Sequence, residues 1–199
     1  FTHDGVYTSA AANSLYATII GEGFTRLLAA GTPGEHELRR PLRARNMEGA
    51  GQLPITREML SGDWERVAPA EVGGSSFANH FDALWVTKTP GAKLTFTFTG
   101  TRAWLFDVFG PTTGRVKVTV DGHDRGVRQQ VDPWSYYYRL GGLELAANLS
   151  PGEHTVTVEL LPDAPDRSVP IEAAKKANQY HPEAFAGVAL HLGAICVLQ

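Results

Sequence analysis

Three segments of this 199-residue chain alternate between apolar and polar side chains, and this pattern constrains the fold more than any other feature. In residues 93–100, a leucine and two phenylalanines occupy every second position, and threonines lie between them. Residues 114–121 and 154–161 repeat the pattern with valines and a leucine opposite lysine, threonine and glutamate. Such alternation is typical of strands with one buried and one solvated face. The sequence therefore predicts antiparallel β-structure.

Weaker strand patterns extend this prediction over the second two-thirds of the chain. Turn-forming pairs such as Pro90-Gly91, Asp121-Gly122 and Pro151-Gly152 separate the segments. Roughly eight or nine short strands, with almost no helix between them, predict a mainly β fold, an antiparallel β-sandwich. A long loop with one helical turn is expected over residues 162–184. The weaker strands are expected at Trp64–Val67, Ala83–Lys88, Arg102–Phe109, Gly126–Val131, Tyr136–Leu140 and Ala186–Leu198.

The amino-terminal part of the chain predicts a helix, because its apolar residues recur at three- and four-residue steps. Thr8 or Ser9 can cap its start by accepting a backbone N–H bond. Such an apolar face must be buried, and the region that follows offers no matching element. We therefore expect a terminal helix at residues 1–30, an irregular linker at 31–62 and the β-sandwich at 63–199. The apolar face comprises Leu15, Ile19, Ile20, Phe24, Leu27 and Leu28.

Charge and composition argue against several classes of function. Lys and Arg number 18 against 21 Asp and Glu, a net charge of −3 with no basic run, so no nucleic-acid partner is expected. The longest apolar stretch is shorter than the roughly 18 residues of a membrane span, so no membrane partner is expected. The single cysteine, Cys196, excludes an internal disulfide framework and a cysteine metal site. The seven histidines lack metal-ligand spacing, so we expect no metal and no cofactor.

Four short blocks carry a further pattern of strand ends and turns. A strand ends in Phe-Thr-Gly-Thr (Ala92–Thr101), Gly110–Gly114 follows, another strand ends in Val-Asp-Gly (Val116–Gly122), and Pro-Gly-Glu-His-Thr-Val opens a strand within Leu149–Val158. This pattern resembles the galactose-binding-like jelly-roll domains attached to bacterial carbohydrate-active enzymes, over roughly residues 63–199. The resemblance implies a jelly-roll sandwich and favours a secreted or periplasmic protein. Related sandwiches bind sugars, bind protein partners or only support a catalytic domain, so the resemblance does not identify the ligand.

A second, shorter block precedes the predicted helix: Thr-His-Asp-Gly-Val-Tyr-Thr, from Thr2 to Thr8. It resembles the last conserved block of SGNH (GDSL-type) hydrolases, where an Asp-x-x-His turn supplies the acid and base of the triad. On this resemblance Asp4 takes the acid position and Tyr7 stands at the base position. Tyrosine, with an unperturbed pKa of about 10, is a poor base near neutrality, so the adjacent His3 is the candidate base. The chain contains no Gly-Asp-Ser nucleophile block.

Three interpretations of this block stay open. It is the tail of a hydrolase whose serine lies in an upstream portion, with Asp4 and His3 as acid and base. It is the tail of a relative that lost catalysis. Or it is a chance match, in which Asp4 and Thr8 are only turn and cap residues. The chain begins at Phe1 rather than Met, so we expect it to be the end of something larger. On the second and third interpretations this chain is expected to hydrolyse nothing unaided, and on the first it depends on the upstream serine.

One short segment combines the two residue types that bind carbohydrate. A sugar ring presents apolar C–H faces that stack on Trp or Tyr, while its hydroxyls need charged, amide or backbone partners. Trp85 is a further candidate, because it lies on the strand face opposite Leu84 and Val86. The alternative is core or interface packing, and alternation in Tyr136–Tyr138 places at least one tyrosine inward. The candidates are Trp134, Tyr136, Tyr137, Tyr138, Asp132, Arg139 and Trp85.

These interpretations combine into one prediction with one alternative. The chain is predicted to be the C-terminal portion of an SGNH-type ester hydrolase, a carbohydrate acetyl esterase with an accessory jelly-roll domain. Its expected partners are a glycan or acylated carbohydrate, and an upstream catalytic segment or another chain that covers the N-terminal helix. The alternative is a non-catalytic carbohydrate-binding or interaction module whose helix packs on the sandwich.

Overall fold

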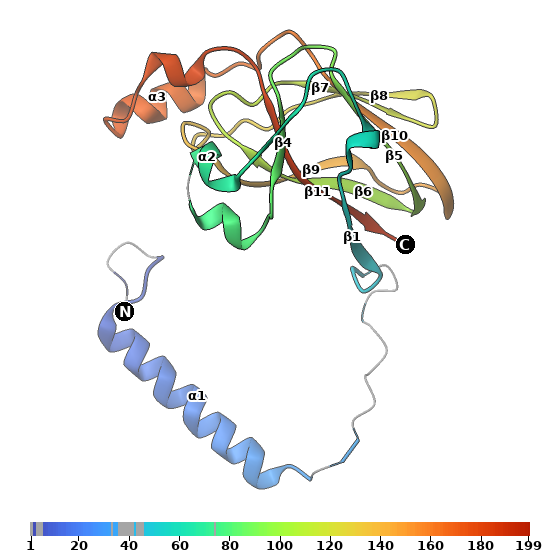
Figure 1. Cartoon of the computed structure of the whole chain (residues 1–199). Coiled ribbons are helices and arrows are strands. Elements are labelled where there is room, and N and C mark those ends of the chain that lie inside the picture. The colour runs from blue at the N-terminus through green and yellow to red at the C-terminus, as the bar shows by residue number, and fades with distance from the viewer. Residues whose placement is uncertain (1, 3–5, 33, 36–41, 43–45, 74) are drawn as a thin grey trace. The chain divides into compact units, whose positions relative to one another are not determined.

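The structure is a computed structural model, and it describes residues 2, 6–32, 34–35, 42, 46–73 and 75–199. The chain divides into two compact units, Phe1–Ala44 and Arg45–Gln199, and each is described by itself (Figure 1). No helix within the described ranges combines the length and apolar character that a membrane crossing needs.

The first unit contains helix α1 (Ala10–Ala30), which the three- and four-residue apolar steps predicted. Ser9 caps its start, because the Ser9 hydroxyl accepts a hydrogen bond from the backbone N–H of Ala12 at 3.2 Å. The large apolar side chains of α1 are exposed, from 42% at Leu15 to 72% at Leu27. Helix α1 therefore presents a broad apolar face, made of Leu15, Ile19, Ile20, Phe24, Leu27 and Leu28.

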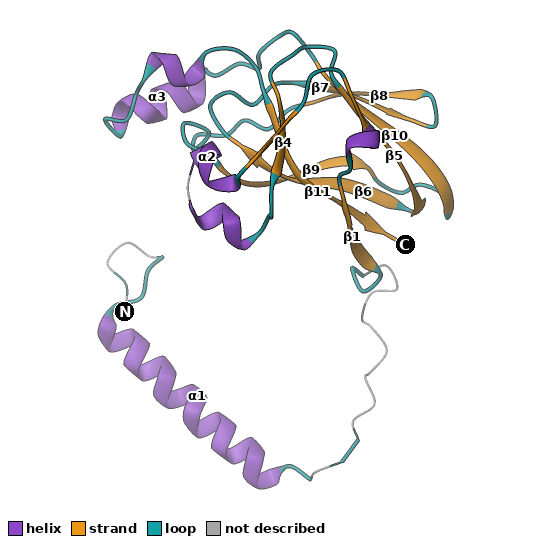
Figure 2. Cartoon of the chain, viewed as in Figure 1, coloured by secondary structure: helices purple, strands orange, loops and turns teal. Residues whose placement is uncertain are grey.

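The second unit is a sandwich of two antiparallel sheets, which confirms the predicted mainly β, jelly-roll type of fold (Figure 2). The first sheet has the order β3-β4-β11-β6-β9, with β1 also paired to β11, and the second has the order β2-β5-β10-β7-β8. The first-sheet strands are β1 (Ala50–Pro54), β3 (Glu65–Val67), β4 (Leu84–Thr87), β6 (Arg102–Phe109), β9 (Arg139–Ala146) and β11 (Leu190–Leu198). The second-sheet strands are β2 (Leu60–Ser61), β5 (Lys93–Gly100), β7 (Val116–Val120), β8 (His123–Arg128) and β10 (Gly152–Leu160).

The three strictly alternating segments become the adjacent strands β5, β10 and β7 of the second sheet. Their apolar side chains are buried between the sheets, and their threonines face outward. Outward Thr95 and Thr157 lie opposite each other with their hydroxyl oxygens 3.1 Å apart, and the Thr97 and Thr155 hydroxyls are 3.3 Å apart. Cross-strand pairs of this kind add to the pairing of the sheet.

Several element bounds differ from the sequence prediction. Strands β1 and β2 lie within residues 31–62 and pair with β11 and β5, so the sandwich begins upstream of residue 63. Residues 136–138 are not in a strand, since a turn covers residues 133–136, and β9 begins at Arg139. The long excursion between β10 and β11 contains helix α3 (Ser168–Lys176) and the short 3-10 helix η3 (Pro182–Phe185). The remaining short helices are η1 (Arg57–Met59), α2 (Pro69–Gly73) and η2 (Ser75–Asn79).

A second, smaller apolar core covers the outer face of the first sheet. Phe77 and Phe81, from η2 and the turn after it, pack on Leu84, Val86 and Val108 of strands β4 and β6. The first sheet is thus apolar on both faces here, because Leu192 of β11 and Leu105 of β6 face the main core between the sheets.

Candidate functional site

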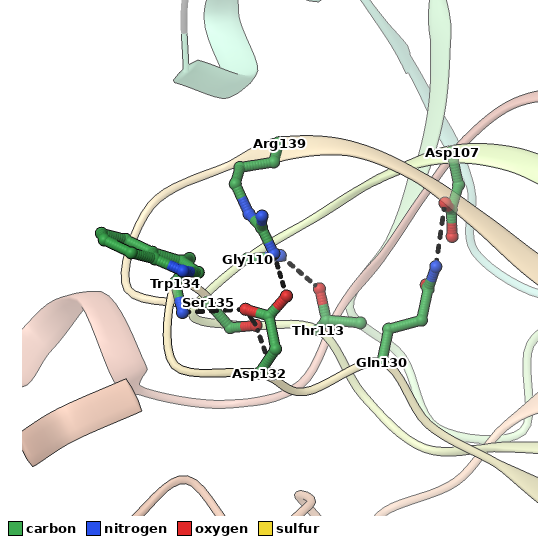
Figure 3. Close-up of polar contacts among 8 residues, drawn as sticks. All are labelled: Asp107, Gly110, Thr113, Gln130, Asp132, Trp134, Ser135 and Arg139. Carbon is green, nitrogen blue, oxygen red and sulfur yellow. Dashed lines mark hydrogen bonds and ion pairs between the residues drawn. The ribbon is translucent and has the colours of Figure 1, made fainter. Parts of the chain in front are cut away.

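Residues 129–138 connect β8 to β9, and we call this segment the aromatic loop. Asp132 organises it: its Oδ1 accepts hydrogen bonds from the backbone N–H of Trp134 at 2.8 Å and from the Ser135 hydroxyl at 3.2 Å (Figure 3). Its Oδ2 forms an ion pair with the guanidinium of Arg139. Burial raises the pKa of the Asp132 carboxyl, but the hydrogen bonds from Arg139 and Trp134 outweigh burial, so this pKa lies below its usual range. Asp132 is therefore ionised near neutral pH.

Three aromatic rings of the loop form one partly exposed cluster. The ring centroids of Trp134 and Tyr136 are 6.2 Å apart, and those of Tyr136 and Tyr137 are 5.1 Å apart. Trp134 is 55% exposed and Tyr137 is 44% exposed. Figure 3 shows the Trp134 indole directed away from the pair formed by Asp132 and Arg139. The loop thus presents apolar ring faces to solvent beside a charged pair.

Cation–π contacts fix the position of the Arg139 side chain. Its guanidinium lies 4.7 Å from the ring centroid of Phe109 and 5.8 Å from that of Tyr137. Together with the ion pair to Asp132, these contacts hold the charged and aromatic groups of the loop in one arrangement.

Tyr138 turns inward, as the alternation of the three tyrosines predicted for at least one of them. Its hydroxyl lies 2.7 Å from the Thr112 hydroxyl, and its ring meets the His191 ring edge-on at 5.1 Å. The backbone of Gly110 passes so close that a Cβ there would lie 2.7 Å from Cδ1 of Tyr138. Glycine is therefore needed at this position, and Tyr138 supports the loop from within.

Asp107 is a buried acidic residue that the sequence analysis did not single out. It lies on the inner face of β6, is 4% exposed, and accepts one hydrogen bond from the Gln130 side chain at 3.3 Å (Figure 3). Burial raises the pKa of Asp107 to about 7, against the opposing effect of Gln130. The one available signal was an aspartate at an inward position of an otherwise apolar strand. Because Gln130 is the second residue of the aromatic loop, this hydrogen bond ties the loop to the sandwich interior.

Trp85 lies apart from the aromatic loop, in a pocket of its own. Its indole N–H donates to the backbone carbonyl of Ile55 at 3.0 Å, and its ring packs partly against the main core. It lines a pocket of about 270 Å³ together with Arg66, His80 and Asp82. This pocket lies near the point on β11 where its pairing partner changes from β4 to β1. The candidate residues therefore fall into an aromatic-loop group, the inward Tyr138, and Trp85.

The proposed acid and base at the amino terminus, Asp4 and His3, lie outside the described residues. Tyr7 is described and is 77% exposed. Within the described parts of the chain, no group of three or more His, Cys, Asp or Glu side chains is placed to hold a metal ion.

The fold and the loop define a jelly-roll β-sandwich with an exposed aromatic surface, and comparison with solved structures identifies similar folds. A two-domain esterase active on acetylated mannans, co-crystallised with mannopentaose, is 13% identical with a TM-score of 0.67, covering 100% of this chain and 48% of that one. A second structure of a two-domain esterase active on acetylated mannans is 13% identical with a TM-score of 0.65, covering 95% and 47%. The chain thus spans about half the length of these esterases.

A third similar structure is the CBM36-1 domain of a multidomain xylanase from the hindgut metagenome of Trinervitermes trinervoides. It is 9% identical with a TM-score of 0.43, covering 74% of this chain and 94% of that one. No protein-family model and no curated protein sequence matches the chain. At these identities the two esterases show a shared fold.

Proposed function

We propose that the β-sandwich is a carbohydrate-binding module and that the aromatic loop is its binding surface. The observation that carries this proposal is the exposed cluster of Trp134, Tyr136 and Tyr137, held beside the ion pair of Asp132 and Arg139. A sugar ring offers apolar C–H faces and polar hydroxyls at once, and this loop presents groups that match both.

The charged side chains of the loop can form hydrogen bonds with sugar hydroxyl groups. An arginine has five N–H donors, and the ion pair with Asp132 leaves some of them for a ligand. The Asp132 carboxylate, ionised near neutral pH, can accept a hydrogen bond from a sugar hydroxyl. Because the loop is already ordered by its own hydrogen bonds, binding would not have to order it.

The proposed ligand is a mannan oligosaccharide, in its free or acetylated form. This choice is supported by the fold shared with two-domain esterases that act on acetylated mannans, one of them co-crystallised with mannopentaose. Mannopentaose is therefore the probe of choice.

The test is titration calorimetry of the protein with mannopentaose. The Trp134→Ala variant is expected to weaken binding about tenfold or more, because it removes the largest exposed ring of the loop. Val127→Ala is the matched control, since Val127 is also an exposed apolar residue, on the neighbouring strand β8. Binding that is equally strong in wild type and in Trp134→Ala, or absent in both, overturns the assignment.

A second function follows from a different observation. The first esterase matches this chain over its whole length, helix unit included, and helix α1 exposes a broad apolar face. We infer from these features that the chain is the C-terminal part of an SGNH-type ester hydrolase, with α1 packed in its catalytic domain. Asp4 would then be the acid and His3 the base of a catalytic triad, and acetylated glycan the substrate.

This second function is tested on the protein as it is encoded, with acetylated mannan and p-nitrophenyl acetate as substrates. Asp4→Asn and His3→Ala are each expected to lower kcat by about 100-fold or more, because they remove members of the acid–base machinery. Tyr7→Phe is the control and should retain activity. Unchanged turnover in His3→Ala would exclude His3 as the base, and activity of residues 1–199 alone would contradict the need for a further serine block.

A further inference from the structure

A cavity of about 570 Å³ lies over the outer face of the first sheet, apart from the aromatic rings at the loop surface. Glu65 of β3 and His191 of β11 line it from the sheet, Lys88 lines it from just after β4, and Glu183 of η3 lines it from the excursion before β11. Thr112 and Tyr138 line a further side. This volume falls in the range of small-molecule binding sites.

His191 is the most unusual group of the cavity. Its side chain is 6% exposed, and its Nδ1 has no hydrogen-bond partner among the described residues. Buried polar atoms in proteins are nearly always paired, so an unpaired one calls for an explanation. Burial lowers the pKa of His191 to about 4, and the positive charge of Lys88 contributes to this lowering. Near neutral pH the imidazole is therefore uncharged, with one N–H donor and one lone-pair acceptor.

Thr112 and Tyr138 supply a second polar group. Their hydroxyl oxygens lie 2.7 Å apart, so one hydroxyl donates to the other. Whichever of the two donates, the accepting hydroxyl keeps its own proton, which it can give to a third group. Beside His191 the cavity thus offers both a donor and acceptors within one small volume.

The charges on the cavity wall restrict the ligand further. Three carboxylates, from Glu65, Glu71 and Glu183, line it with the single ammonium group of Lys88. This excess of negative charge repels carboxylate- or phosphate-bearing ligands. A neutral ligand with several hydroxyl groups fits this set, because each hydroxyl can both donate and accept.

We propose that this cavity is a second ligand site of the chain and that it binds a neutral sugar, with a sugar hydroxyl bonded to the imidazole of His191. The proposal rests on the carbohydrate-binding function proposed above, but it uses neither the exposed rings of Trp134, Tyr136 and Tyr137 nor the ion pair of Asp132 and Arg139. A ligand hydroxyl at His191 would satisfy the polar atom that the protein leaves unpaired. Leaving such an atom unpaired is costly in a folded protein, which favours the bound state.

The experiment is NMR titration of the protein with D-mannose, D-galactose and D-xylose, and with D-glucuronate as the anionic comparison. The ring resonances of His191 and Tyr138 report on the cavity, and the indole N–H of Trp134 reports on the aromatic loop. The neutral sugars are expected to shift the His191 and Tyr138 resonances saturably, and glucuronate to shift them weakly or not at all. Absence of any such shift up to about 50 mM neutral sugar overturns the proposal.

Two variants test the assignment within the cavity. Ala186→Trp places a bulky ring on an exposed residue that lines it, and should abolish the His191 shifts. Thr112→Val removes a lining hydroxyl and should weaken the affinity about three- to tenfold. Thr99→Val, on the outer face of β5, is the matched control and should bind as wild type does. Shifts that persist in Ala186→Trp would place the sugar elsewhere and contradict the proposal.

This experiment tests the two proposed sites independently of each other. Trp134→Ala should leave the His191 shifts unchanged, because that indole does not line the cavity. Sugar-dependent shifts of Trp134 without shifts of His191 would overturn the proposed cavity site but would support the aromatic loop as a binding surface. Shifts of His191 without shifts of Trp134 would support the cavity site, while the aromatic loop is tested by the titration with mannopentaose.

Discussion

Asp132 and Arg139 lie seven residues apart and form an ion pair that closes the base of the aromatic loop. The residues between them include the rings of Trp134, Tyr136 and Tyr137, so the ion pair fixes the part of the loop that faces solvent. Neither group is fully exposed, and Arg139 also packs on Phe109, which makes the pair more than a surface contact. The loop is ordered before any ligand arrives.

Removing the Asp132 carboxylate should therefore weaken glycan binding without touching the aromatic rings. Asp132→Ala loses the hydrogen bonds to Trp134 and Ser135 and leaves Arg139 without its partner. We expect a several-fold loss of mannopentaose affinity by calorimetry and a loss of about 1–2 kcal/mol in the free energy of unfolding. Asp124→Ala is the control, because Asp124 accepts a similar turn bond from Gly126 away from the loop. Equal effects of the two variants on affinity would contradict the role of Asp132.

The buried carboxyl of Asp107 should make the protein less stable as pH rises. Its pKa of about 7 in the folded state exceeds the unfolded value, so the folded state binds more protons between these two values. The free energy of unfolding should therefore fall as pH rises from about 4 to about 7. Asp107→Asn keeps an acceptor for Gln130 and should be more stable than wild type at pH 8, by at most on the order of 4 kcal/mol. Urea unfolding at pH 5 and pH 8 measures this; a variant less stable at both values would contradict it.

His154 and Asp121 give a second pH dependence, in the second sheet. The ring nitrogens of His154 lie 2.8 Å from the Ser150 carbonyl and 2.7 Å from Oδ2 of Asp121, and these hydrogen bonds raise the pKa of His154. The hydrogen bond from His154 and that from the Thr155 backbone lower the pKa of Asp121. The stabilisation from the histidine is complete below its unfolded pKa and is lost as pH rises through the raised folded pKa.

The contribution of Asp121 has the opposite sign. It is present above the unfolded pKa of the carboxyl and is lost as pH falls through the lowered folded pKa. The pair should therefore stabilise the fold most between about pH 4 and pH 6.5. His154→Gln should reduce the unfolding free energy more at pH 5.5 than at pH 9, as measured by urea unfolding. A loss of equal size at both values would show that the charge of His154 is not involved.

Gly193 of β11 should not tolerate a side chain. A Cβ at this position would lie 2.1 Å from Cε1 of Phe81, a buried residue of the second core. Gly193→Ala should therefore cost about 1–3 kcal/mol of unfolding free energy, because the ring must move within a packed cluster. Gly142→Ala on the neighbouring region of the same sheet has room for a Cβ and serves as the control. Thermal unfolding that does not distinguish the two variants would contradict this packing.

The apolar face of α1 should bind hydrophobic surfaces when nothing covers it. Phe24→Glu places a charge in the middle of this face, while Thr25→Glu adds the same charge at the next position without removing an apolar side chain. We expect Phe24→Glu to lower the fluorescence of bound anilinonaphthalene sulfonate and to reduce self-association in sedimentation velocity. Thr25→Glu should do neither. If both variants behave as wild type does, the face does not govern association.

The sequence predicted the strands whose pattern is local. Strands β5, β7 and β10 alternate strictly because each has one face in the main core and one in solvent. Strand β1 was missed because most of its residues are exposed, which leaves no periodic signal. The start of β9 was placed too early, because the side chain of Asp132 stabilises a turn where β-propensity alone favours a strand.

The candidate site could be predicted only in part, for a related reason. Trp134, Tyr136, Tyr137, Asp132 and Arg139 are close in sequence and come together in one loop. Contacts between distant residues, such as Gln130 with Asp107 or Tyr138 with His191, depend on the sheet topology and leave no local signal. Trp85 faces away from Leu84 and Val86 as predicted, but the two faces of its strand meet two different apolar cores. Alternation identifies opposite faces and does not say which of them is solvated.

The most direct test of glycan binding by the aromatic loop follows the four tryptophans during one titration with mannopentaose. Each indole N–H resonance reports on a different place. That of Trp64 reports on the main core, and that of Trp85 on the pocket beside His80. That of Trp104 reports on strand β6, and that of Trp134 on the aromatic loop. We predict a saturable shift of the Trp134 resonance, with the other three unchanged or changed far less. A titration in which the Trp134 resonance does not shift would contradict the assignment of the aromatic loop as the glycan-binding surface. This holds whether the Trp85 or Trp104 resonance shifts or none does.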